Sequence, residues 1–253
     1  ALAGCYGNPS SLHRKGLEAE KRIKAASQTF LTAIKAPTDK GEILYTSGGT
    51  EANNLAISGV AALLRPNRRH IITSAVEHSS VLETVLEWEK RGFEVTLLKP
   101  DTNGIITPEQ VLAAVIPETG MISLMHVNNE TGAIFDLGAN LKGRLRALRD
   151  RDDLPVFHVD AVQSFGKLPI DVRAMGIDLL TTSAHKIHGP KGIGFLYRDK
   201  AIRLKPLVFG GGQQGGVRPG TENVPGILGM EAAFKALPMD AATHLKALRN
   251  RLW

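Results

Sequence analysis

The sequence is short of cysteine, of long apolar runs and of aromatic residues, and each shortage excludes something. Its 253 residues contain one cysteine, Cys5, so no intrachain disulfide can form. That fits a reducing, cytoplasmic compartment. No run of about 18 apolar residues occurs, so neither a transmembrane helix nor a membrane partner is expected. Aromatic residues make up 5% and charged residues 22%, which is typical of a soluble globular chain.

The distribution of charge argues against a nucleic-acid partner, and the spacing of the histidines argues against a metal site. Lysine and arginine outnumber the acidic residues by 31 to 25, which gives a formal net charge of +6. The basic residues are scattered, and the densest cluster, Arg65–Arg69, is interpreted as a solvated surface loop. No nucleic-acid partner is therefore expected. The eight histidines and one cysteine show no metal-ligand spacing, so no metal is predicted.

Apolar runs alternate with amphipathic stretches along the whole chain. Strands are predicted at 42–46, 70–74, 93–98, 121–127, 155–160, 179–183 and 192–197. Helices are predicted from Ser10 or Ser11 to Ala33, and over 50–64, 78–91, a short stretch capped by Thr107, 137–151 and most of 225–252. This order indicates an α/β fold with a mainly parallel sheet and helices on both faces.

Polar side chains follow five of the predicted strands. In open α/β sheets ligands bind beyond the carboxyl ends of the strands, so these loops are expected to form one site. The loops are Ser47-Gly48-Gly49-Thr50, Glu77-His78, Asn128-Asn129-Glu130, Asp160 with Gln163, and Ser183-Ala184-His185-Lys186.

The first loop suits a phosphate group. Gly48 and Gly49 let an anion approach the backbone at the start of a helix, and Thr50 adds a hydroxyl. The alternative is a tight turn with Thr50 as the helix N-cap. The sequence matches neither the nucleoside-triphosphate loop nor the dinucleotide fingerprint, so both of those ligands are disfavoured.

Asp160 and Lys186 together suit pyridoxal 5′-phosphate. This cofactor needs a lysine to form a Schiff base and an anion beside its pyridine nitrogen. Alone, Asp160 could be a helix cap or a surface ion-pair member, and Lys186 a surface lysine. Ser183 and His185 flank Lys186 with donors for a phosphate. The competing Lys191 lies in a Gly-Pro-Lys-Gly turn and is interpreted as exposed.

Three further residues have functional and ordinary interpretations. His78 could stack on an aromatic ring and move protons, or it could be a capping or core histidine. Asn129 and Gln163 carry amides suited to a ring hydroxyl, although each could be an ordinary loop residue. Cys5 is interpreted as a packed or inert thiol rather than a nucleophile.

These motifs resemble those of cysteine desulfurases, which are class-V aminotransferase-like enzymes of fold-type I. The matching stretches occur in the family's order along almost the whole chain. They are residues 6–11, Thr46–Asn54, Glu77-His78, His126–Gly132, His158–Ser164, Ser183–Gly192 and Arg218–Asn223.

The resemblance implies a role for each matching residue. Lys186 would hold pyridoxal phosphate and move the substrate α-proton, while Asp160 would pair with the ring nitrogen. The other implied contacts are His78 stacking on the ring, Gln163 at the ring hydroxyl, Asn129 near ring and substrate, and Gly49, Thr50, Ser183 and His185 around the phosphate. Thr221 would reach the phosphate of the other subunit, which implies a homodimer.

The resemblance also implies the reaction. The family removes sulfur from L-cysteine, giving L-alanine and an enzyme persulfide that passes to an acceptor or scaffold protein, for example in iron–sulfur cluster assembly. A selenocysteine lyase or related β-lyase would carry the same cofactor loops. A non-enzymatic chain, acting as a truncated scaffold or partner-binding protein, is the third hypothesis.

The sequence departs from the family pattern at its two ends. The family's persulfide cysteine and substrate-binding arginine are expected beyond Trp253, and its first strand before Ala1. The nucleophile role is not transferred to Cys5, so the chain alone is expected to be inactive. On this view residues 1–230 form the cofactor-binding large domain, and residues 231–253 begin the helix that connects to an absent small domain.

Overall fold

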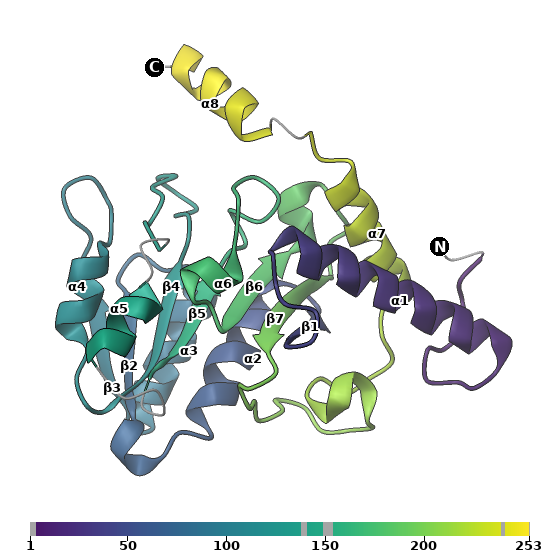
Figure 1. The fold of residues 1–253 in the computed structure, drawn as a ribbon, viewed down its shortest axis with the longest axis horizontal. Helices are drawn as coiled ribbons and strands as arrows, with labels where there is room; N and C mark the ends of the chain where they lie inside the picture. Colours follow the sequence, from purple (N-terminus) through teal and green to yellow (C-terminus); the bar gives the residue numbers. More distant parts are fainter. Residues whose placement is uncertain (1–3, 138–140, 149–153, 239–240, 253) are drawn as a thin grey trace.

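A seven-stranded sheet with the order β1-β7-β6-β5-β4-β2-β3 organises the chain (Figure 1). The computed structural model describes residues 4–137, 141–148, 154–238 and 241–252. Only β7 runs antiparallel to its neighbours, β1 and β6, and all the other pairs are parallel. The strands are β1 Gly41–Thr46, β2 His70–Ser74, β3 Glu94–Leu98, β4 Thr119–Met125, β5 Val156–Asp160, β6 Leu179–Ser183 and β7 Gly194–Asp199. The predicted mainly parallel α/β sheet is confirmed.

Helices cover both faces of this sheet. They are α1 Arg14–Ala33, α2 Gly49–Ala61, α3 Ser79–Lys90, α4 Pro108–Ala114, α5 Leu141–Leu148, α6 Val172–Met175 and α7 Val224–Lys235. The last helix, α8 Ala241–Leu252, extends away from the sheet (Figure 1). The apolar side chains of α2 and α3 pack in one cluster, and those of α1, α4, α5, α6 and α7 in another. Successive strand residues alternate between these clusters, as Leu179 and Leu180 do in β6.

Aromatic rings fill the core between α1, α7 and the sheet. Phe30 of α1 lies with its ring centroid 4.9 Å from that of Phe195 in β7. Phe165 stacks on Phe234 of α7 at 5.1 Å, and it meets Phe195 edge to face at 5.3 Å. Such pairs stabilise a core beyond the area that they bury. They fix α1 and α7 against the end of the sheet that carries β6 and β7.

A buried histidine links the three central strands. His158 of β5 is fully buried, with Nδ1 2.8 Å from the Ser123 hydroxyl of β4 and Nε2 3.0 Å from the Thr181 hydroxyl of β6. Burial without a neighbouring acid lowers the pKa of His158 to about 3. The ring is therefore neutral, and both of its nitrogens have hydroxyl partners.

The ends of several elements differ from the predictions. The first helix begins at Arg14 rather than near Ser10, because His13 is its N-cap and accepts from the Gly16 amide at 3.2 Å. The helix after β1 begins at Gly49 with Gly48 as N-cap, so the alternative of Thr50 as N-cap is wrong. The predicted cap at Thr107 is confirmed as a capping box with Gln110.

Three other expectations change. Arg68 lies in a short 3-10 helix and is buried, so the solvated-loop interpretation of its cluster is wrong at that residue. The helix α6 was not predicted, because its one turn is too short for a periodic pattern; Asp171 caps it. The predicted helix 137–151 is observed over Leu141–Leu148, and residues 138–140 and 149–151 lie outside the described ranges.

The buried His158 predicts an acid-sensitive core. Below its ordinary pKa of about 6.5 the unfolded chain binds a proton at this residue, whereas the folded chain excludes it until about pH 3. The free energy of unfolding should therefore fall as the pH drops through this range, by up to about 1.4 kcal/mol per pH unit from this group. Urea titrations at several pH values would measure the slope, which should be shallower in His158→Gln.

A matched control is available on the surface. His244 of α8 is exposed, so His244→Gln should keep the slope of the unaltered chain. Equal slopes for His158→Gln and the unaltered chain would show that the folded core accepts the proton.

Candidate functional site

The predicted site residues meet at one edge of the sheet. Because β7 alone is antiparallel, β1 ends on the same edge as β2, β4, β5 and β6. The loops that follow these strands enclose a cavity of about 310 Å³. All the predicted site residues except Thr221 line it: Gly49, Thr50, His78, Asn129, Asp160, Gln163, Ser183, His185 and Lys186.

One end of the cavity is built to receive an anion. Gly48, the N-cap of α2, gives the helix no side-chain cap, so the first amide groups of α2 are available to an anion, and Gly49 and Thr50 line the cavity. A Cβ on Gly49 would lie 2.8 Å from Cγ2 of Val162, so a larger residue there would force the Val162 side chain to shift. The Ser183 hydroxyl lies 2.8 Å from Nδ1 of His185. Partial desolvation and the positive charges of Lys186 and Lys191 lower the pKa of His185.

A buried acidic residue, Asp160, lines the cavity at the end of β5. Asp160 is buried, and its two carboxylate oxygens accept from the Val162 amide at 2.9 Å and from Nδ2 of Asn53 at 2.8 Å. Burial raises the pKa of Asp160, while these two hydrogen bonds, and His78 when its imidazole is protonated, act in the other direction. The carboxyl group is thus held in a fixed orientation on the cavity wall.

Lys186 also lines the cavity. It belongs to a 3-10 helix, Ala184–Ile187, whose Ala184 and Ile187 side chains are buried and anchor the turn. Burial and the charge of Lys186 lower the pKa of Lys167. Lys191 is exposed and does not line the cavity, as predicted.

Two polar residues of the cavity wall were missed in the sequence. Asn53 of α2 donates from Nδ2 to Asp160 and, at 2.8 Å, to the hydroxyl of Ser80 in α3. The Ser80 hydroxyl lies 2.8 Å from Nδ1 of His78. The position of Asn53 three residues after Thr50 was a usable signal, since residues three apart share a helix face. His78 is the N-cap of α3, so its capping interpretation and its place in the cavity both hold.

A second buried carboxyl group lies behind the cavity. One oxygen of Glu77 accepts from the Ser74 hydroxyl at 2.7 Å and from the Met125 amide at 3.0 Å, which joins the ends of β2 and β4. Burial, with a contribution from the charge of Asp160, raises the pKa of Glu77 to about 8. Glu77 is therefore mostly neutral at pH 7 and acts as a structural link.

Thr221 and Cys5 lie away from the cavity. Thr221 is exposed in the loop before α7, and the adjoining Arg218 ties this loop to α2 by an ion pair with Glu51 at 2.7 Å. Cys5 is buried against Val224 and neighbouring apolar side chains, as the packed interpretation predicted. Within the described ranges no group of three or more histidine, cysteine or acidic residues could hold a metal ion.

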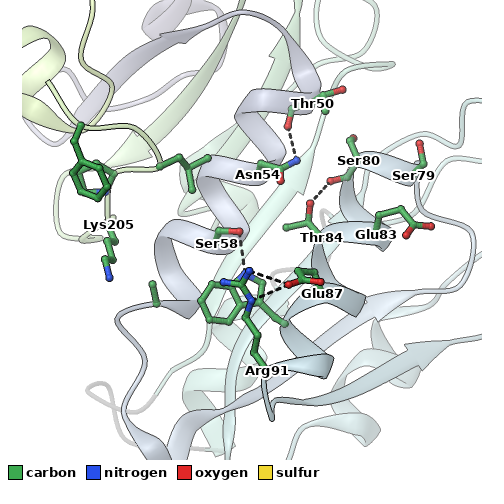
Figure 2. A pocket seen from close by; sticks show the side chains of 15 residues that line it. Thr50, Asn54, Ser58, Ser79, Ser80, Glu83, Thr84, Glu87, Arg91 and Lys205 are labelled. Atoms are coloured by element: carbon green, nitrogen blue, oxygen red, sulfur yellow. Dashed lines mark hydrogen bonds and ion pairs between the residues drawn. The ribbon is translucent and has the colours of Figure 1, made fainter.

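A larger groove of about 640 Å³ adjoins the cavity between α2, α3 and residues 205–209 (Figure 2). Thr50 and Ser80 line both hollows. In the groove Arg91 pairs with Glu87 at 2.9 Å, and the Trp88 indole donates to Ser58 at 2.9 Å. Lys205 lines this groove, but neither a histidine nor a buried carboxylate does, so the smaller cavity is the better candidate site.

Comparison with known proteins gives consistent matches over the whole chain. The family model for class-V aminotransferases matches residues 2–251. The cysteine desulfurases IscS of Shewanella sediminis and of Escherichia coli O139:H28 are 46% and 44% identical to the chain over its full length. The chain spans 62% of the length of these curated relatives.

Solved structures agree with the fold. A NifS-like protein superposes with a TM-score of 0.90 at 34% identity, covering 99% of this chain and 68% of its own. A structure described as SspA in complex with cysteine gives 0.87 at 40% identity, covering 98% and 70%. The predicted fold, the large domain of a fold-type I pyridoxal-phosphate enzyme, is confirmed. The chain is thus a homologue of cysteine desulfurases and belongs to the aminotransferase class-V family.

Proposed function

We propose that the chain is the pyridoxal 5′-phosphate-binding part of a cysteine desulfurase, an enzyme that converts L-cysteine to L-alanine and an enzyme persulfide. The observation that carries this proposal is the single cavity in which Lys186, the buried Asp160 carboxylate and a hydroxyl–imidazole cluster meet. The similarity to the IscS proteins, which are named as cysteine desulfurases, supports the same activity.

The donors of the cavity fit the cofactor at both ends. Thr50, Ser183 and His185, with the first amides of α2, would bind its phosphate. Gly49 lines the cavity without a side chain, so its backbone amide would be accessible to this group. Asp160 would bind the protonated ring nitrogen, and that ion pair would favour the ionised carboxylate despite its burial. When bound, pyridoxal phosphate supplies an electron sink for cleavage of bonds at the substrate α-carbon.

The remaining residues would orient and protect the reaction. Lys186 would hold the cofactor through Nζ, and its amine would also carry the α-proton of the substrate. His78 would lie against the ring, with the Gln163 amide at the ring hydroxyl and Asn129 near the substrate. Met125, Val127 and Val162 give the cavity an apolar wall that would limit the access of water.

A homodimer would complete this site. Thr221 does not line the cavity of its own chain, which agrees with the proposal that it serves the phosphate of a second copy. The same long connection exposes Leu207, Val208 and Phe209, the last with 83% of its surface accessible. An exposed apolar segment of this kind favours burial against a partner.

The proposal also covers the cellular compartment, the sulfur acceptor and the domain boundary. We propose a cytoplasmic enzyme that passes sulfur to an acceptor or scaffold protein. Among the described helices none is long and apolar enough to cross a membrane. The large domain would end near residue 230, within α7, and the following helical residues would lead to a small domain.

Covalent attachment should depend on Lys186. Adding pyridoxal phosphate should produce a violet absorption band in the unaltered chain and in Lys191→Ala, but not in Lys186→Ala. After borohydride reduction, peptide mass spectrometry should find the cofactor on Lys186. Attachment to Lys191 or to no lysine, in chains shown to be folded by circular dichroism, would refute the proposed site.

Cys5 should have no part in sulfur transfer. Because its thiol is buried away from the cavity, Cys5→Ser should bind pyridoxal phosphate as tightly as the unaltered chain. Neither chain should form a persulfide from L-cysteine, as judged by alkylation and mass spectrometry. A persulfide on Cys5 would overturn this assignment.

The exposed apolar segment should govern self-association. We expect a dimer by analytical ultracentrifugation, and at least a tenfold weaker association in Phe209→Asp, because a charge is costly to bury in an apolar contact. Leu97, which is 40% exposed on the edge strand β3, supplies the control, since Leu97→Asp should remain dimeric. Equal association in all three chains would place the interface elsewhere.

A further inference from the structure

A line of hydrogen bonds joins His78 to Asp160 through two residues with no assigned role. The first link is from Nδ2 of Asn53 to Oδ2 of Asp160, at 2.8 Å. The second is from the same nitrogen to Oγ of Ser80, also at 2.8 Å. The third joins Oγ of Ser80 and Nδ1 of His78 at 2.8 Å. All four residues line the cavity, and Asn53, Ser80 and Asp160 are buried.

The direction of donation can be worked out from the atoms. A side-chain amide nitrogen has two hydrogens, and the two partners of Asn53 use both. The opposite orientation of the amide would turn Oδ1 of Asn53 towards Oδ2 of Asp160, so two acceptors would meet unless the carboxyl group were protonated. Oδ1 of Asn53 is buried and has no hydrogen-bond partner among the described residues. The carboxylate therefore selects the orientation of the amide.

The hydroxyl of Ser80 passes this orientation on to His78. Because Oγ accepts from Asn53, its single hydrogen is available to Nδ1 of the imidazole. The backbone amide of Ser80 also donates to Nδ1, at 3.1 Å. An imidazole nitrogen that accepts two hydrogen bonds carries no proton, and in a neutral ring the proton must then lie on Nε2.

We propose that Asn53 and Ser80 are positioning residues, which hold His78 in the tautomer protonated on Nε2 and couple this ring to the carboxylate of Asp160. His78 would then offer the cavity a donor at Nε2, while Nδ1 would be unable to act as a base. The part played in the reaction rests on the proposed function, but the tautomer itself does not require a bound cofactor.

Packing explains why these two residues can act in this way. Asn53 lies in the second turn of α2 and Ser80 in the first turn of α3, and the two helices pack side by side. Ser79, the neighbour of Ser80, is exposed at the start of the same helix (Figure 2). The chain thus has two adjacent serines, of which only Ser80 has a hydrogen bond to Asn53, and this makes Ser79 a matched control.

Nitrogen-15 spectra of the ring measure the tautomer directly. In the chain without cofactor, labelled on histidine, we expect Nδ1 of His78 to give a signal of an unprotonated nitrogen and Nε2 that of a protonated one. Ser80→Ala removes one donor to Nδ1, so the Nδ1 signal should move towards that of a nitrogen with fewer hydrogen bonds. The ratio of tautomers should shift towards Nδ1–H by about two- to tenfold, the effect of one neutral hydrogen bond.

Three further variants separate positioning from folding. Asn53→Ala should move the same signal in the same direction, because the Ser80 hydroxyl is then free to rotate. Ser80→Thr keeps a hydroxyl and should restore the original spectrum, and Ser79→Ala should leave it unchanged. A proton on Nδ1 in the unaltered chain, or an Nδ1 signal unmoved in both Ser80→Ala and Asn53→Ala, would overturn the proposal.

Binding of pyridoxal phosphate gives an independent second measurement. If Asn53 and Ser80 act together, Asn53→Ala and Ser80→Ala should each raise the dissociation constant for pyridoxal phosphate. The double variant should then raise it by a factor smaller than the product of the two single factors. Strictly multiplicative effects would refute the coupling. An unaltered chain with the expected tautomer but no affinity for the cofactor would refute the proposed function and leave the tautomer assignment intact.

Discussion

The site depends on a carboxylate that is buried at the end of a central strand. Asp160 loses its water when β5 packs between β4 and β6, and desolvation of a charged group is costly unless hydrogen bonds replace the water. The Val162 amide and the Asn53 amide supply those bonds, one to each oxygen. Since Asn53 belongs to α2, the same interaction fixes that helix over the sheet edge. The helix that would receive the phosphate and the acid that would receive the ring nitrogen are thus held by one contact.

Strand direction explains how distant segments reach this edge. A parallel sheet gathers the loops after its strands, so His78, Asn129, Asp160 and Lys186 come together from four separate connections. The antiparallel β7 does not disturb this arrangement. Because β1 is in turn antiparallel to β7, β1 runs parallel to β6, and the glycine turn after β1 lies on the same edge as the other loops.

Much of the fold and the site could be predicted from the sequence, because strand-end loops and apolar periodicity are local signals. The structure brings Lys186 and the other predicted lining residues into one cavity, which is the geometry that the loops required. Helix starts were less predictable, since histidine is not among the favoured N-cap residues and His13 nevertheless caps α1. The burial of Arg68 could not be predicted because burial depends on tertiary contacts. Asn53 and Ser80 were missed for a related reason. The spacing of Asn53 after Thr50 was a usable signal for its helix face, but its contact with Ser80 arises from the packing of α2 against α3, which the sequence of one segment does not show.

Two buried carboxyl groups lie close together, and their surroundings give them different roles. Both pKa values are raised by burial, but Asp160 has a donor on each oxygen, whereas Oε2 of Glu77 has no partner among the described residues. The charge of one acid also disfavours ionisation of the other, so two neighbouring anions would be costly. The arrangement of lower free energy has an ionised Asp160, which hydrogen-bond donors and a bound cation can stabilise, and a protonated, neutral Glu77. That distribution places the negative charge on the cavity wall and a neutral link between β2 and β4 behind it.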